Sequence, residues 1–314
     1  MTRAARSPTN DSLAGDFAGV LYGLCAFGLW GLSPIYFKAV DHVGATEVLG
    51  HRVVWSMLLL CGLLLLRKRG RQLLFEFRSP KRIGFYLLTA LLVSTNWLIF
   101  IWSIHNDRLL EASLGYYINP LVNVVLGMAF LNERLNLWQS LAVALATIGV
   151  VNLVINSGTF PWVALTLAFS FGFYGLLRKK AGMDAVLGLT VETLLLSPLA
   201  LVFLAGLAVH GSGSFAQGDL KTDVLLVSAG LVTAVPLVCF LEATQRLRLM
   251  TVGLMQYLAP TLNFLLAVVA YREPFTLTHL ATFLCIWAAL AVYSFDAFRS
   301  RRRLRDVEAT SMNE

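Results

Sequence analysis

The sequence consists of long apolar blocks separated by short polar segments. Each block is about 20 residues long, the length of α-helix that crosses the hydrocarbon core of a bilayer. A membrane β-barrel would instead show alternating segments of about ten residues, and the sequence has none. The pattern therefore predicts an all-α integral membrane protein of ten transmembrane helices, at 17–37, 48–66, 83–103, 112–131, 137–156, 161–177, 186–209, 224–244, 251–270 and 277–297.

The composition agrees with a membrane environment. Of the 314 residues, 57% are hydrophobic and only 14% are charged, whereas soluble domains average about 25% charged residues. The four cysteines lie within apolar blocks and lack the spacing of metal ligands, so we expect small core residues there. They are Cys25, Cys61, Cys239 and Cys285. Neither a metal nor a cofactor is expected.

The basic residues are distributed unevenly between the two predicted sides of the membrane. Of 25 Lys and Arg residues, 20 fall on one side, four fall on the other, and Arg52 lies inside a predicted helix. This bias follows the positive-inside rule and places both termini in the cytoplasm. The net charge of +7 is thus explained by topology, and a nucleic-acid partner is not expected. We interpret 1–16 and 298–314 as disordered cytoplasmic tails.

An internal repeat relates the two halves of the chain. At a shift of 140 positions, Lys38 corresponds to Arg178. Five helices in each half, 17–156 and 157–297, is an odd number, so the second half must enter the membrane from the opposite side. Inverted-topology repeats are typical of secondary transporters, in which the substrate binds near the midplane between the halves. The same shift matches four further pairs, Tyr117 with Tyr257, Pro120 with Pro260, Asn123 with Asn263, and Glu133 with Glu273.

Exchange between two arrangements of such halves would expose a central site to alternate sides of the membrane. We therefore predict a permease that moves a small organic metabolite or drug-like solute by alternating access. The alternatives are an intramembrane enzyme and a non-transporting membrane protein with a duplicated helix bundle.

Arg52 is the charged residue that the pattern explains least. It lies a turn inside the predicted helix 48–66, and the repeat places Glu192 at the equivalent position. A guanidinium at this depth needs a carboxylate, carbonyl groups or a wet cavity. One hypothesis is that Arg52 faces the central cavity and binds an anionic group or pairs with Glu192. The other is that it snorkels outward beside His51 and Glu47.

Aromatic and polar residues inside the predicted helices form the rest of a candidate solute pathway. Aromatic walls with few polar groups suit an amphipathic organic solute. Belt residues at the membrane surface and hydrogen bonds between helices are the competing explanation. The predicted pathway residues are Trp30, Tyr36, Arg52, Asn96, Trp97, Tyr116, Tyr117, Asn119, Asn123, Glu192, Gln256, Tyr257 and Asn263. Helix bends are expected at Pro120, Pro198, Pro236 and Pro260.

The sequence contains few features of an enzyme. It has no HExxH, GxSxG or phosphate-binding loop motif, so we expect neither catalysis nor ATP hydrolysis. The cluster with most catalytic character is His105, Asn106, Asp107 and Glu111. It is either a proton site or a solvated loop beside a helix N-terminus, and we favour the loop. Glu192 and Glu242 are the only acids well inside predicted helices and are the candidates for proton coupling.

Several stretches carry a resemblance to a known family. They include AFGLWGLSPIYFK, EVLGHRVVWS, LEASLGYYINPLVN and QYLAPTLNFLLAV. The chain resembles the RarD, or chloramphenicol-sensitive-protein, family in the EamA branch of the drug/metabolite transporter superfamily, from about residue 17 to 298. The resemblance implies a ten-helix permease of the bacterial inner membrane with cytoplasmic termini, whose partners are the lipid bilayer and a small-molecule solute. It leaves open the substrate, the direction of transport, the coupling ion and whether a homodimer forms.

Overall fold

The computed structural model describes residues 8–131, 136–157, 160–181, 184–246, 255–289, 291–292 and 294–295, and all regular secondary structure within them is helical. The side chains of 8–16 and of some positions inside helices, among them Pro120 and Asn123, are outside this description. The elements are α1 (Pro8–Ala39), α2 (Ala45–Leu66), α3 (Gly70–Glu76), α4 (Pro80–His105), α5 (Leu109–Leu131), α6 (Leu137–Ser157), α7 (Trp162–Ala181), α8 (Ala185–Val209), α9 (Leu220–Arg246), α11 (Leu258–Leu265) and the π-helix η1 (Leu266–Ala270), followed by a helix at Leu277–Ala289.

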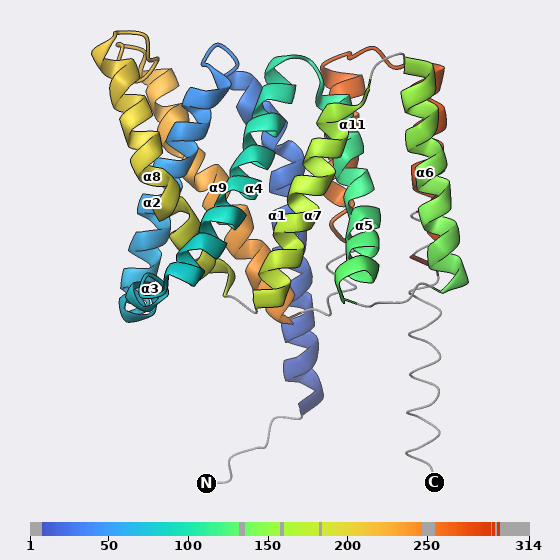
Figure 1. Ribbon diagram of the computed structural model, residues 1–314, viewed down its shortest axis with the longest axis horizontal. Coiled ribbons are helices and arrows are strands. Elements are labelled where there is room, and N and C mark those ends of the chain that lie inside the picture. Colours follow the sequence, from blue (N-terminus) through green and yellow to red (C-terminus); the bar gives the residue numbers. More distant parts are fainter. Residues whose placement is uncertain are drawn as a thin grey trace.

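The long helices stand side by side in one bundle (Figure 1). Five of the described helices are long and apolar enough to cross a membrane. Shorter apolar helices lie at Ser140–Asn152, Trp162–Arg178, Leu258–Ala270 and Leu277–Ala289. The five long ones are Phe17–Ala39, Ala45–Leu66, Pro80–His105, Val186–Val209 and Leu220–Phe240.

Helices in the two halves begin at matching positions. Three pairs of helices, α2 with α8, α4 with α9, and α6 with the last helix, start 140 residues apart. Their first residues are Ala45 and Ala185, Pro80 and Leu220, and Leu137 and Leu277.

The packing of the helices also comes in corresponding pairs. In the repeat, α1, α2, α4 and α5 are equivalent to α7, α8, α9 and α11. Helices α1 and α2 both pack on α9, and their equivalents α7 and α8 both pack on α4. Likewise, α5 packs on α7 and its equivalent α11 packs on α1. At one end of α4, Trp102 lies 5.0 Å from the ring of Trp162, in the first turn of α7. At the same end, His105 lies 3.1 Å from the carbonyl oxygen of Phe37, in the last turn of α1. Helices α1 and α7 therefore run in opposite directions.

The first helix is longer than predicted. It begins at Pro8, so residues 8–16 are helical and the expectation that all of 1–16 is disordered is wrong. Proline suits the first turn of a helix, where its missing N–H is not needed. Extending the helix also satisfies the backbone where the chain leaves the apolar layer.

The segment predicted as a helix at 251–270 is divided. Its described part has a turn at 256–257, followed by α11 and η1. Pro260 therefore lies in the first turn of α11, which tolerates proline, and not in the middle of a continuous helix. Residues 251–254 are outside the described part of the chain.

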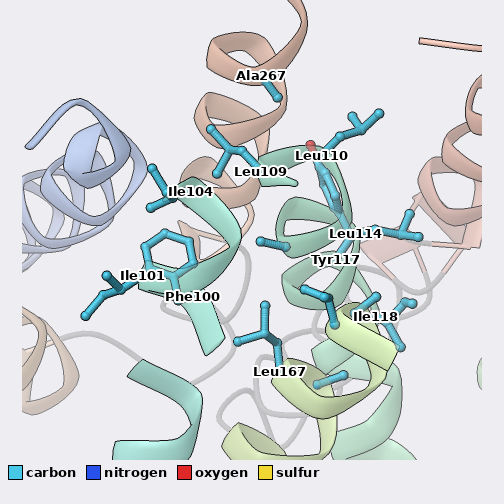
Figure 2. Close-up of a cluster of buried hydrophobic side chains, with 14 of the residues drawn as sticks. Phe100, Ile101, Ile104, Leu109, Leu110, Leu114, Tyr117, Ile118, Leu167 and Ala267 are labelled. Carbon is cyan, nitrogen blue, oxygen red and sulfur yellow. The ribbon is translucent and has the colours of Figure 1, made fainter. Parts of the chain in front are cut away.

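A buried apolar cluster joins α4, α5, α7 and η1. Gly115 of α5 allows the closest approach, since a Cβ atom there would lie 2.7 Å from the carbonyl oxygen of Ala164 in α7. Glycine at such contacts lets helix backbones approach in membranes, where packing drives association. Figure 2 shows part of the cluster, with Phe100, Ile101 and Ile104 of α4, Leu114 and Tyr117 of α5, Leu167 of α7 and Ala267 of η1.

Glu273 ties the start of α5 to the segment that follows η1. Its carboxylate accepts hydrogen bonds from the backbone N–H groups of Leu109 and Leu110, both at 2.8 Å. A carboxylate at this position satisfies two donors that the helix leaves unpaired and complements the helix dipole. Burial raises the pKa of the Glu273 carboxyl, and the two amide donors act in the opposite direction.

Candidate functional site

Arg52 lies on α2 among four other helices. It is seven residues beyond Ala45, about 10 Å along the helix at 1.5 Å per residue. Only 7% of the residue is exposed. Its Nε donates a hydrogen bond of 2.8 Å to the hydroxyl oxygen of Thr233 on α9. The side chain of Arg52 is therefore buried between helices.

Aromatic rings contact the guanidinium of Arg52. Its central carbon lies 4.3 Å from the ring centroid of Trp97 on α4 and 5.5 Å from that of Phe37 on α1. Both distances are within the range of cation–π attraction, which is strongest where the cation is desolvated. The ring of Tyr36 lies 5.0 Å from that of Phe37. Phe100 continues the aromatic group, with its ring 5.9 Å from Phe37 and 5.5 Å from Tyr116.

Glu47 and His51, which lie near Arg52 in the sequence, form hydrogen bonds with other residues. Glu47 accepts hydrogen bonds from the backbone N–H of Ser214 at 2.6 Å and from its hydroxyl at 3.2 Å. His51 accepts a bond of 3.3 Å from the indole N–H of Trp55. Among the described residues, no carboxylate lies within ion-pair distance of Arg52.

Glu192 pairs with Arg178 and not with Arg52. The Nη1 of Arg178 lies 3.0 Å from Oε1 of Glu192, and the two side chains are 11% and 0% exposed. Thr89 donates to the same carboxylate at 2.7 Å and Tyr174 donates at 3.1 Å. The buried charge of Glu192 is therefore neutralised and its oxygens are hydrogen-bonded, as a buried carboxylate requires.

Arg178 reaches this position because α7 is longer than predicted. The helix continues to Ala181, so Arg178 is a residue of the bundle and not a loop charge. Gly188 of α8 makes room for it, since a Cβ atom there would overlap Nη1 of Arg178. The repeat aligns Arg178 with Lys38, so the sequence showed that both positions carry a basic residue but not which acid each one pairs with. Lys38 instead pairs with Asp107 at 2.7 Å.

Four predicted pathway residues form hydrogen bonds between helices. Asn96 of α4 donates to the carbonyl oxygen of Leu167 at 3.0 Å and to the hydroxyl of Ser170 at 3.1 Å, both on α7. It also accepts a bond of 3.1 Å from the hydroxyl of Tyr116. The other two bonds join Asn119 to the carbonyl oxygen of Ala168 at 2.9 Å and Tyr117 to Thr261 at 2.7 Å.

The remaining pathway residues are more scattered. Trp30 contacts the rings of Phe27 and Phe240 at 5.7 Å each. Tyr36 donates a 2.7 Å hydrogen bond to the carbonyl oxygen of Leu225 on α9. Gln256 and Tyr257 lie half-buried in the turn before α11, and the side chain of Asn123 lies outside the described residues. Asn263 is buried, and its Oδ1 accepts no hydrogen bond within the described ranges.

The predicted bend residues have different environments. Pro198 and Pro236 lie inside α8 and α9, and Pro34, which the sequence analysis did not select, lies inside α1. Pro120 falls within the bounds of α5, but its side chain is outside the description.

The cluster His105, Asn106, Asp107 and Glu111 does not converge on one point. Its members contact separate groups: Asp107 forms an ion pair with Lys38, and Glu111 forms one with Arg108 at 3.4 Å. Glu242 pairs with Arg246 on α9. A search of the described residues finds no group of three or more metal-ligating side chains.

Comparison with known proteins gives consistent matches along the chain. The EamA-like transporter family matches it twice, over residues 17–155 and 161–295. The chain is 50% identical over 287 residues to an uncharacterized transporter of Vibrio cholerae serotype O1, with 91% of this chain and 95% of the relative covered. It is 47% identical over 285 residues to protein RarD of Salmonella typhimurium, covering 91% and 97% of the two chains.

Protein RarD of Escherichia coli K12 is 45% identical over 285 residues, covering 91% of this chain and 96% of the relative. One solved structure, described as the crystal structure of a protein, aligns with a TM-score of 0.58 at 20% identity and covers 90% of this chain and 97% of its own. This last likeness concerns the fold alone.

Proposed function

We propose that this chain, which belongs to the EamA-like transporter family and to its RarD members, is a secondary permease for a small organic solute. As a transporter-family protein with several apolar helices, it is a multi-pass membrane protein. The proposal adds ten transmembrane helices in two inverted repeats, 17–156 and 157–297, with both termini in the cytoplasm. The solute would bind between the repeats and be released by alternating access.

The observation that carries the proposal is the structural correspondence between the two halves of the chain. Corresponding helices begin 140 residues apart and pack on corresponding partners, and α1 and α7 run in opposite directions. Two such units can rock against each other around a site between them. The twofold match to the EamA-like family, once in each half, supports the same division.

Transport by purified protein in proteoliposomes tests the proposal. The screen would use labelled amino acids, organic acids and chloramphenicol-like amphiphiles, with protein-free vesicles as the control. We expect saturable uptake of at least one class, accelerated by unlabelled solute on the opposite side, because an alternating carrier exchanges faster than it returns empty. A correctly folded preparation that neither takes up nor exchanges any class would contradict a permease function.

A further inference from the structure

The buried charges of the two halves do not balance. The equivalent positions 52 and 192 carry Arg52 and Glu192, each seven residues into its helix. Glu192 is neutralised by Arg178, whereas Arg52 has no acidic partner among the described residues. The region around Arg52 therefore retains one positive charge in a mostly apolar bundle, which is costly without a counter-charge.

We infer that the transported solute is a monoanionic carboxylate and that Arg52 binds its carboxylate group. This rests on the proposed function and names the solute class for it. A single carboxylate supplies the missing negative charge, whereas a doubly charged phosphate monoester would leave a net negative charge in the same place. A neutral solute would leave Arg52 uncompensated.

The hydrogen bonding of Arg52 matches this ligand. Its Nε is already used by Thr233, and its two terminal amino groups donate no hydrogen bond to the described residues. These two groups point along one edge of a rigid plane, the geometry that binds both oxygens of a carboxylate. The contacts with Thr233, Trp97 and Phe37 hold that plane in place before the solute arrives.

The surroundings also indicate what is attached to the carboxylate. Trp97 and Phe37 contact the guanidinium directly. Tyr36 packs on Phe37, and Tyr116 extends the aromatic surface through Phe100. The hydroxyl groups of both tyrosines are already engaged, with Leu225 and Asn96 respectively. We therefore expect the remainder of the solute to be apolar or aromatic rather than rich in hydroxyl groups.

The first test uses the wild-type protein and needs no substitution. Purified protein is titrated with phenylacetate, octanoate and benzoate, with the matched amides, with phenethylamine and with phenyl phosphate, and the thermal midpoint and Trp fluorescence are measured. We expect at least one acid to raise the midpoint while its amide and the amine do not. Amides that act as strongly as the acids, or a panel in which no acid acts, would overturn the inference. A response confined to phenyl phosphate would also overturn it.

The second test assigns the binding to Arg52. Against the acid that acts most strongly, Arg52→Gln should weaken binding about 10-fold or more, and Arg52→Lys should fall between, because it keeps the charge but loses the planar fork. Arg71→Gln, on the exposed face of α3, is the matched control and should bind as wild type does. Full affinity in a folded Arg52→Gln protein would overturn the assignment.

The permease function and the inferred solute class can be refuted separately. Acid binding that depends on Arg52 without uptake in vesicles would remove the permease function and leave the binding site. Uptake of a neutral solute that is unaffected by Arg52→Gln would retain the permease and overturn the inferred solute class.

Discussion

At the scale of single residues, the two buried charges at equivalent positions, Glu192 and Arg52, have different kinds of partner. Glu192 receives hydrogen bonds from Thr89, Tyr174 and Arg178, so its desolvation is offset by several partners. Arg52 is held by one hydroxyl and by aromatic rings. The first arrangement maintains the structure, and the second leaves hydrogen-bonding capacity for a ligand.

A structural role for Glu192 predicts a large effect of neutralising it. Glu192→Gln removes the carboxylate that pairs with the buried Arg178 and should destabilise the protein by about 3 kcal/mol. The exposed Lys38–Asp107 pair offers the control, since Asp107→Asn should cost at most about 1 kcal/mol. Thermal unfolding in detergent measures both. Equal midpoints for the two variants would show that the Glu192 pair is not a main contributor to stability.

The sequence identified the unusual residues more successfully than their partners. Arg52 and Glu192 were visible as charges in apolar text, but the partner of Glu192 depended on the end of α7, a few residues beyond the predicted one. Thr233 and Phe37 carried no signal, because a threonine or a phenylalanine in an apolar helix is common. Several predicted pathway residues, Asn96 among them, are engaged in bonds between helices.

At the scale of helices, close contacts between backbones determine where elements pack. Gly115 brings α5 against α7, and a Cβ atom there would lie 2.7 Å from a backbone carbonyl oxygen, which cannot move aside as a flexible side chain can. Gly175, on α7 itself, has no atom within 4 Å of the position its Cβ would take. The two glycines therefore differ in the space available for a side chain.

We expect Gly115→Ala to destabilise the protein by about 1–3 kcal/mol, because α5 and α7 must separate or shift. Gly175→Ala should be neutral or stabilising by up to about 1 kcal/mol, since alanine favours the helix and meets no obstacle. Unfolding midpoints of both variants in the same detergent provide the comparison. The packing described for α5 and α7 would be wrong if Gly115→Ala were as stable as Gly175→Ala.

At the scale of the whole molecule, hydropathy predicted the helical class, and the repeat at a shift of 140 positions agrees with the helix starts that lie 140 residues apart. Length and composition mark five of the described helices as able to cross a membrane, compared with the ten that the apolar blocks predict. The sequence pattern missed α3, whose seven residues are too short for a periodic signal. It also missed the turn before α11, because an apolar run does not reveal where its backbone hydrogen bonds change.

The proposed inverted topology predicts that two equivalent positions, 106 and 246, face opposite sides of the membrane, and both are exposed in the structure. In a background without the native cysteines, Asn106→Cys should react with a membrane-impermeant maleimide added to intact cells. Arg246→Cys should react only after the membrane is permeabilised. Reaction of both from the same side would refute the inversion.

The exchange of arginine for glutamate between positions 52 and 192 has an energetic consequence. If the two halves of an inverted-repeat carrier were identical, a twofold rotation would relate its outward-facing and inward-facing states, which would then have equal free energy. Here one half carries the Arg178–Glu192 ion pair, and the other carries Arg52, which has no acidic partner among the described residues, so the two states would differ in free energy. A carrier working by the proposed alternating access would therefore populate its two faces unequally when empty, and this bias would belong to the chain itself before any ion gradient acts on it.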